Sequence, residues 1–251
     1  MNQNSPIGIF DSGIGGVTVL KEIVKILPKE KYIYYSDSKN NPYGDKSDIE
    51  IKEICNKIVR FFIEKDCKAI VIACNTASAK AASYLRNKYK NLLFIAIEPA
   101  YKMVYDYAYD EPTLVMATKG TIESEKFQQL YKKYNNNKTK CIKAVELAEL
   151  IEEGKKEEIK KYLQKHIGMY KGKIKDVVLG CTHYPLIQKD IQKILGDVRF
   201  FNGAPYVAKN LKNMLYERNL LSNNKDIIKI DFIDSSNSKE KEKRFFNIME
   251  N

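Results

Sequence analysis

The stretch "KAIVIACNTAS" (residues 68–78) is repeated in outline by "KDVVLGCTHYP" (residues 175–185). Each begins with a lysine and a short apolar run rich in β-branched residues. A small residue and a cysteine follow, and then side chains that carry an amide, a hydroxyl or an imidazole. A short apolar run with polar boundaries is typical of a buried parallel strand. Both stretches therefore predict a buried strand that ends at a cysteine.

The rest of the chain alternates short apolar runs with longer amphipathic stretches, which predicts an α/β fold with parallel strands. The expected strands are 6–10, 31–37, 68–74, 92–98, 112–118, 175–181 and 227–234. The expected helices are 15–27, 47–66, 78–90, 123–134, 145–167, 184–195 and 206–219.

In this alternation the two cysteine stretches occupy equivalent strand ends. The number of residues between Cys74 and Cys181 equals the number between Asp11 and Thr118, which also end expected strands. One common offset predicts two similar lobes.

Ligands of open α/β sheets bind beyond the carboxyl ends of the strands, so two facing lobes would share one cleft. Cys74 and Cys181 would lie there near helix N-termini, whose positive dipole ends lower the pKa of a thiol. The alternative is that both are small buried hydrophobic residues. His183, two residues after Cys181, could exchange a proton with its thiol. A zinc site from these two cysteines and His183 is a further alternative, although a fourth ligand is not evident.

Other short motifs have an ordinary structural interpretation beside a functional one. "DSGIGG" (11–16) fits neither a dinucleotide fingerprint nor a Walker loop. It predicts a glycine turn, or a turn that directs Asp11 and Ser12 into the cleft. "NNPYG" (40–44) predicts a turn set by Pro42 and Gly44. Cys141 precedes an expected helix, and His166 falls on an expected surface helix.

The composition limits the location and the partners of the protein. The net charge of +11 would suit nucleic acid, but lysines alternate with glutamates in stretches such as "SKEKEKR" (238–244), as on solvated helix faces. Nucleic acid is therefore not the partner that we expect. The five cysteines form no disulfide framework, and we find neither a secretory signal nor an apolar run of about 18 residues. We expect a cytoplasmic protein that is not bound to a membrane.

A series of motifs in this order resembles the glutamate racemases of the aspartate/glutamate racemase family. The motifs are "IGIFDSGIGG", "YYSDSKNNPYGDKS", "VIACNTASA", "IEP", "TKGTIES" and "VLGCTHYPL", spread over most of the chain. Related aspartate racemases usually have glutamate in the place of His183. The resemblance implies a cofactor-independent racemase, with no bound metal, of two pseudosymmetric α/β lobes around one active site. One lobe would comprise 1–97 and 208–251, and the other 98–207.

The resemblance also implies a role for the duplicated cysteine. A base must remove the α-proton on one face of glutamate while an acid supplies a proton on the other. The counterpart of Cys74 takes the proton from D-glutamate, and that of Cys181 takes it from L-glutamate. Asp11 matches an acid beside the first thiol and His183 a group beside the second. Glu152 matches a glutamate that orients the histidine.

Further residues match substrate contacts of the family. They are Ser12, Pro42, Tyr43, Gly44, Asn75, Thr76, Thr118, Thr121 and Thr182, together with Asp11 and His183. Ala117, "CIKAVELAELIEEG" (141–154) and "FNGAPY" (201–206) depart from the usual family sequence. We therefore expect D-glutamate production for peptidoglycan and, as in the family, a homodimer. The alternatives are a racemase for aspartate or another amino acid, and a basic regulatory protein that contacts DNA or a DNA-handling enzyme.

Overall fold

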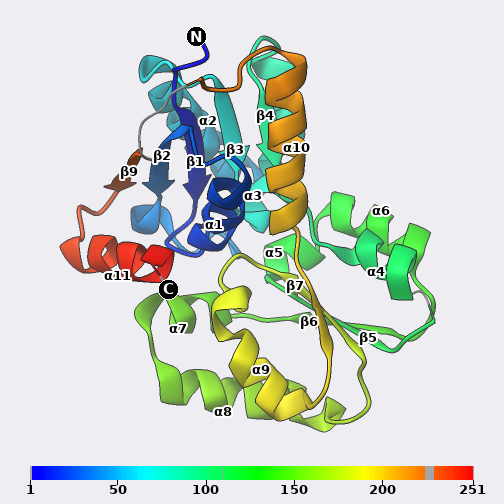
Figure 1. Cartoon of the computed structure of the whole chain (residues 1–251). Helices are drawn as coiled ribbons and strands as arrows, with labels where there is room; N and C mark the ends of the chain where they lie inside the picture. The colour runs from blue at the N-terminus through cyan, green and yellow to red at the C-terminus, as the bar shows by residue number, and fades with distance from the viewer. Residues whose placement is uncertain (1, 109, 224–228, 251) are drawn as a thin grey trace.

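The computed structural model describes residues 2–108, 110–223 and 229–250, which form two β-sheets covered by helices (Figure 1). The strands are β1 (Ile7–Asp11), β2 (Lys31–Ser36), β3 (Ala69–Ile72), β4 (Phe94–Ala96), β5 (Thr113–Ala117), β6 (Thr139–Lys143), β7 (Asp176–Gly180), β8 (Arg199–Phe201) and β9 (Lys229–Asp234). The first sheet has the order β4-β3-β1-β2-β9 and the second β6-β5-β7-β8. Every pairing in both sheets is parallel. The predicted α/β class with two parallel sheets is confirmed.

Helices connect the strands and cover both faces of each sheet (Figure 1). Around the first sheet they are α1 (Val17–Ile26), α2 (Asp48–Glu64), α3 (Asn75–Lys88), α10 (Ala204–Glu217) and α11 (Lys239–Glu250). Around the second they are α4 (Tyr101–Ala108), α5 (Lys119–Ile122), α6 (Glu125–Tyr134), α7 (Leu147–Glu153), α8 (Lys156–Ile167) and α9 (Gln188–Leu195). Short 3-10 turns lie at η1 (Ser38–Asn40), η2 (Gly168–Tyr170) and η3 (Tyr184–Ile187).

The strands related by the sequence offset occupy matching places in the two sheets. β1 lies between β3 and β2, and β5 lies between β7 and β6. The outer strands β4 and β8 flank β3 and β7 in the same way. The strands that lead to Cys74 and Cys181 are therefore equivalent, and each is paired with the strand that ends at Asp11 or precedes Thr118.

Alternation along the buried strands sends apolar side chains to both faces of a sheet. On β1, Ile7 and Ile9 pack in a cluster with residues of α1 and α10, whereas Phe10 packs with α2 and α3. In the second sheet, Met116 packs against α7, α8 and α9, and Val115 packs against α4 and α6. Each sheet is thus a buried layer, and its strand ends are held rigidly.

Several sequence expectations differ from the structure. The expected helix 145–167 is broken, because Gly154 has φ 73° and closes α7 with N–H bonds to Ile151 and Leu150. Cys141 precedes α7 as expected, but it lies in a strand, β6, that was not expected. Strands β6 and β8 and helices α4, α5 and α11 were not expected. Positions 227–228 of the last expected strand lie outside the described residues.

Within the described ranges, the structure contains no helix that is long and apolar enough to cross a membrane.

Candidate active site

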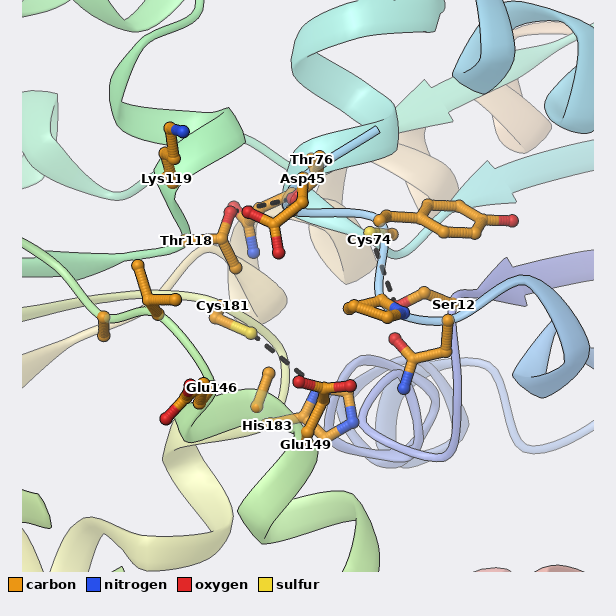
Figure 2. A pocket seen from close by; sticks show the side chains of 18 of the residues that line it. Ser12, Asp45, Cys74, Thr76, Thr118, Lys119, Glu146, Glu149, Cys181 and His183 are labelled. Atoms are coloured by element: carbon orange, nitrogen blue, oxygen red, sulfur yellow. Dashed lines mark hydrogen bonds between the residues drawn. The ribbon is translucent and has the colours of Figure 1, made fainter. Parts of the chain in front are cut away.

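The carboxyl ends of both sheets meet at a pocket (Figure 2). Most of the predicted catalytic and substrate-contact residues line it: Ser12, Pro42, Tyr43, Gly44, Cys74, Asn75, Thr76, Thr118, Cys181, Thr182 and His183. The three remaining predicted residues, Asp11, Thr121 and Glu152, lie behind this lining and bond to members of it. The structure therefore brings all the predicted site residues together, although they come from distant parts of the chain.

Cys74 follows β3 and caps the N-terminus of α3. Its sulfur accepts the backbone N–H of Ala77 at 3.5 Å, and its thiol donates to Ser12 Oγ at 3.9 Å. The side chain is almost fully buried. Burial, with the neighbouring Asp11 carboxylate, raises the pKa of the Cys74 thiol well above its ordinary value. The expectation that the helix N-terminus lowers this pKa is thus wrong for Cys74, because the Ala77 bond does not offset burial. Cys74 is protonated at neutral pH.

Asp11 lies at the end of β1 and is fully buried. Its Oδ2 accepts the Gly16 backbone N–H at 2.7 Å and the Thr182 hydroxyl at 3.1 Å. Its Oδ1 has no hydrogen-bond partner among the described residues. Burial raises the pKa of Asp11, and the charge of His183 opposes this shift. Asp11 therefore joins the first-sheet turn to the loop that follows Cys181.

Cys181 begins a chain of three buried groups on the other side of the pocket. Its Sγ lies 3.7 Å from Nδ1 of His183, and Nε2 of His183 lies 2.6 Å from Oε2 of Glu152. The Glu152 carboxylate also accepts the backbone N–H of Ile14, at 3.1 Å to Oε2. Because a carboxylate only accepts hydrogen bonds, Glu152 holds a proton on Nε2. Nδ1 of His183 then faces the sulfur and can share its proton.

The pKa values of His183 and Glu152 shift in opposite directions. Burial opposes a charge on His183, but its hydrogen bonds to Cys181 and Glu152 raise its pKa well above the ordinary value of 6.5. Burial likewise opposes the Glu152 charge, but the hydrogen bond and charge of His183, helped by Lys241, hold the Glu152 pKa below its usual value. The two groups therefore form a buried ion pair beside Cys181.

Three threonines join the two halves of the pocket. Thr76 Oγ1, in the first turn of α3, lies 2.8 Å from Thr118 Oγ1. The Thr118 hydroxyl donates to Thr121 Oγ1 at 3.0 Å, and its oxygen accepts the Thr121 backbone N–H, which starts α5. Next to them, both polar atoms of the buried Asn75 amide have no hydrogen-bond partner in the described structure. The pocket therefore contains fixed hydroxyls and an unpaired amide.

The turn at Pro42–Gly44 forms another wall of the pocket. The Tyr43 hydroxyl donates to Asp37 Oδ2 at 2.6 Å, and its ring is buried. A Cβ on Gly120 would lie 2.7 Å from the Gly44 carbonyl oxygen, so the close approach of this turn to α5 requires a glycine there. The turn is thus fixed against both halves of the molecule.

Charged residues that the sequence analysis did not single out also line the pocket. They are Asp45, Lys119, Glu146 and Glu149 (Figure 2). Asp45 and Lys119 lie inside motifs quoted in the sequence analysis, so their place in these motifs was enough to predict them as pocket residues. Glu146 and Glu149 come from the stretch that departs from the usual family sequence, and there the helical pattern alone did not indicate a pocket.

A metal site is not found among the described residues, where no three histidine, cysteine, aspartate or glutamate side chains cluster in a way that could hold an ion.

Two parallel α/β sheets each place a thiol in one shared pocket, an arrangement suited to an isomerase that moves a proton at one carbon. Residues 7–211 match the sequence model of the Asp/Glu/Hydantoin racemase family. The chain belongs to this family.

Individual relatives cover nearly the whole chain. The chain is 42% identical to the glutamate racemase of Clostridium kluyveri over 242 residues, which is 94% of each chain. It is 40% identical to the glutamate racemase of Clostridium botulinum over 243 residues, which is 95% of this chain and 94% of the relative. The crystal structure of Francisella tularensis glutamate racemase in complex with D-glutamate matches with a TM-score of 0.84 at 30% identity. That match covers 99% of this chain and 95% of the other.

Proposed function

We propose that this protein is a glutamate racemase, which interconverts L-glutamate and D-glutamate without a cofactor and supplies D-glutamate for peptidoglycan synthesis. The observation that carries the proposal is the pair of thiols, one from each sheet, that line one pocket. The family membership and the glutamate racemases at about 40% identity support glutamate as the substrate.

In the proposed reaction with L-glutamate, the Cys181 thiolate takes the α-proton and becomes a thiol. The electron pair left on the α-carbon is delocalised into the α-carboxylate. The Cys74 thiol then gives its proton to the opposite face, which forms D-glutamate and leaves a thiolate. The raised pKa of Cys74 supports its role as the acid in this direction. The ion pair of His183 and Glu152 supports Cys181 as the base, because the imidazolium can donate to a thiolate.

Polar groups near the thiols would hold the substrate. The unpaired amide of Asn75 and the hydroxyls of Ser12, Thr76 and Thr118 are suited to the two carboxylates of glutamate. Donors at the α-carboxylate would also stabilise the negative charge that develops on proton removal. Asp11 lies behind this lining and would act on Cys74, because its carboxylate contributes to the raised pKa of that thiol.

The test uses purified protein with L-glutamate in D2O and no added cofactor. Deuterium incorporation at the α-carbon, together with loss of optical activity by circular dichroism, is the expected result. Cys74→Ser and Cys181→Ser should each lower racemisation by about 10²–10⁴-fold, because a serine hydroxyl is a much weaker acid. Cys141→Ser is the matched control, since Cys141 lies on β6 away from the pocket. Unchanged conversion by both pocket variants would refute the mechanism.

We further propose the lobes 1–97 with 208–251 and 98–207. The packing of α10 against α1 in the first sheet's core supports the return of the chain to that lobe. From the resemblance we propose a homodimer, and from the five free cysteines a reducing, cytoplasmic location.

A further inference from the structure

The C-terminal helix α11 is anchored on the first sheet by two aromatic residues, Phe245 and Phe246, which both contact Phe232. Phe245 is fully buried, and its ring centroid lies 4.6 Å from that of Tyr34 and 4.5 Å from that of Phe232. Tyr34 is on β2 and Phe232 on β9, so α11 is fixed to two strands of this sheet. The residues of α11 on either side of Phe245 are therefore held in defined positions.

From this anchored helix, Lys241 reaches the carboxylate that binds His183. Its Nζ lies 3.4 Å from Oε1 of Glu152, while Oε2 of the same carboxylate contacts His183 at 2.6 Å. The Lys241 side chain is 27% exposed, and that of Glu152 is 4% exposed. Glu152 thus bridges a lysine of one half of the molecule and a histidine of the other.

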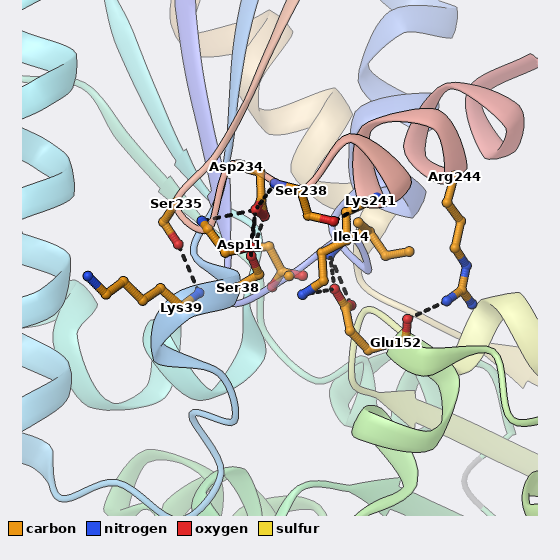
Figure 3. Close-up of polar contacts among 12 residues, drawn as sticks. Asp11, Ile14, Ser38, Lys39, Glu152, Asp234, Ser235, Ser238, Lys241 and Arg244 are labelled. Carbon is orange, nitrogen blue, oxygen red and sulfur yellow. Dashed lines mark hydrogen bonds and ion pairs between the residues drawn. The ribbon is translucent and has the colours of Figure 1, made fainter.

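Arg244, also on α11, binds the main chain of Glu152 and of the residue before it. Its guanidinium donates to the carbonyl oxygens of Ile151 and Glu152, in the last turn of α7 (Figure 3). The last carbonyls of a helix have no partner within the helix and carry partial negative charge, which a cation stabilises. A Cβ on Gly154 would lie 3.4 Å from Nη1 of Arg244, so the guanidinium also packs on the glycine that ends α7. Both the backbone and the carboxylate of Glu152 are therefore held by α11.

We propose that Lys241 and Arg244 are positioning residues for proton transfer at Cys181, acting through Glu152 and His183. The inference rests on the proposed racemase function. Neither residue lines the pocket, so neither contacts substrate. Lys241 keeps the carboxylate ionised and directed at Nε2, and Arg244 keeps α7 at its place beside His183. The sequence stretch "SKEKEKR" was expected to be a solvated helix face, and for these two residues that expectation is wrong.

The charged and titratable groups around Glu152 determine the expected pH effect. They are the cations His183, Lys241 and Arg244 and, on the first sheet, the carboxyl of Asp11 and the phenol of Tyr34. Lys241 contributes to the lowered pKa of Glu152. Loss of its charge therefore raises that pKa, and the acidic limb of the kcat/KM profile should move to higher pH.

The test compares Lys241→Met with Lys243→Met, an exposed lysine on the same helix. The two enantiomers have equal free energies, so kcat/KM is the same in both directions for every variant. We expect it to fall about fivefold in Lys241→Met and to be unchanged in Lys243→Met. Lys241→Arg should restore most of the loss because it keeps the charge. Thermal unfolding followed by circular dichroism establishes that each variant is folded.

Isotope effects separate positioning from a general structural loss. Deuterium at the α-carbon of glutamate lowers kcat/KM. The size of this isotope effect measures how far removal of the α-hydrogen limits the rate. A barrier raised only at Cys181 increases the isotope effect for the enantiomer whose proton goes to Cys181, which is L-glutamate in the proposed mechanism. The isotope effect for the other enantiomer decreases. Arg244→Met should move both effects in the same directions as Lys241→Met.

The two proposals fail in different ways. An inactive wild-type protein would contradict the racemase function itself. If the wild-type protein is active but Lys241→Met and Arg244→Met match Lys243→Met in rate, pH profile and isotope effects, that result would overturn only the role of α11. A uniform loss of rate without opposite changes of the two isotope effects would also overturn it.

Discussion

Gly15 gives a way to displace His183 without changing any group that titrates. A Cβ at this position would lie 2.6 Å from Cε1 and 2.7 Å from Cγ of the His183 ring, and nearer still to Nδ1. The Gly15 backbone does not have a positive φ, so alanine can adopt its conformation. Gly15→Ala is therefore a purely steric perturbation of the ring that faces Cys181.

The geometry gives the size of the effect. Carbon atoms pack at about 3.5 Å, so the imidazole must move by about 1 Å. His183 is buried and is held by Glu152 at 2.6 Å on its far side, so the ring cannot move without lengthening a contact. A displacement of about 1 Å in a catalytic group can cost about 10²-fold, which corresponds to about 2.7 kcal/mol in the barrier. Overpacking should also cost about 1–3 kcal/mol of stability.

The assay is the rate of racemisation by circular dichroism, with L-glutamate and with D-glutamate as the starting substrate. Gly168→Ala is the control, since its Cβ would meet only the flexible end of Gln164, far from the pocket. We expect kcat/KM of Gly15→Ala to fall about 100-fold equally in both directions, while the control is unchanged. A Gly15→Ala protein within about threefold of wild type would show that the position of His183 is not critical.

Two further predictions concern buried ion pairs and are tested by urea unfolding. The raised pKa of His183 stabilises the folded protein fully below pH 6.5, and this stabilisation is lost as the pH rises through the pKa of His183 in the folded state. The lowered pKa of Glu152 stabilises the folded protein fully above pH 4.5, and this stabilisation is lost as the pH falls through the pKa of Glu152 in the folded state. Glu152→Gln should therefore destabilise most between about pH 4.5 and 6.5; a loss independent of pH would contradict this. Lys68→Met leaves Glu30 buried without its cation at 2.5 Å and should cost about 3–5 kcal/mol. Lys25→Met, from an exposed pair, should cost less than about 1 kcal/mol, and equal losses would refute the difference.

The sequence was sufficient for features that depend on local pattern. Apolar runs with sharp polar ends predicted the strands that lead to Cys74 and Cys181, and the repeated offset predicted the equivalence of the two sheets. Strand β6 was missed because it is mainly polar, and β8 because its three residues do not belong to a longer apolar run as those of β4 do. The break at Gly154 was missed because the amphipathic pattern continues across it.

Features that depend on contacts between residues distant in sequence could not be predicted from the local sequence pattern. The pKa of Cys74 is governed by burial and by Asp11, whereas the sequence showed only the helix that follows. Lys241 looks like other lysines in an alternating charged stretch. Its contact with Glu152 exists because Phe245, four residues later, fixes the helix on the first sheet. The resemblance identified Glu152 but not the residues that hold it.

The two halves of the site are equivalent in fold but not in chemistry. The Cys74 thiol lies beside Ser12 and Asp11, which keep its proton in place, whereas Cys181 lies beside the ion pair of His183 and Glu152. This difference cannot change the equilibrium, because the two enantiomers have the same free energy. In the proposed mechanism, L-glutamate loses its α-proton to Cys181 and D-glutamate loses its α-proton to Cys74. Because different groups surround the two thiols, substitutions around each thiol should alter kcat separately for the two enantiomers.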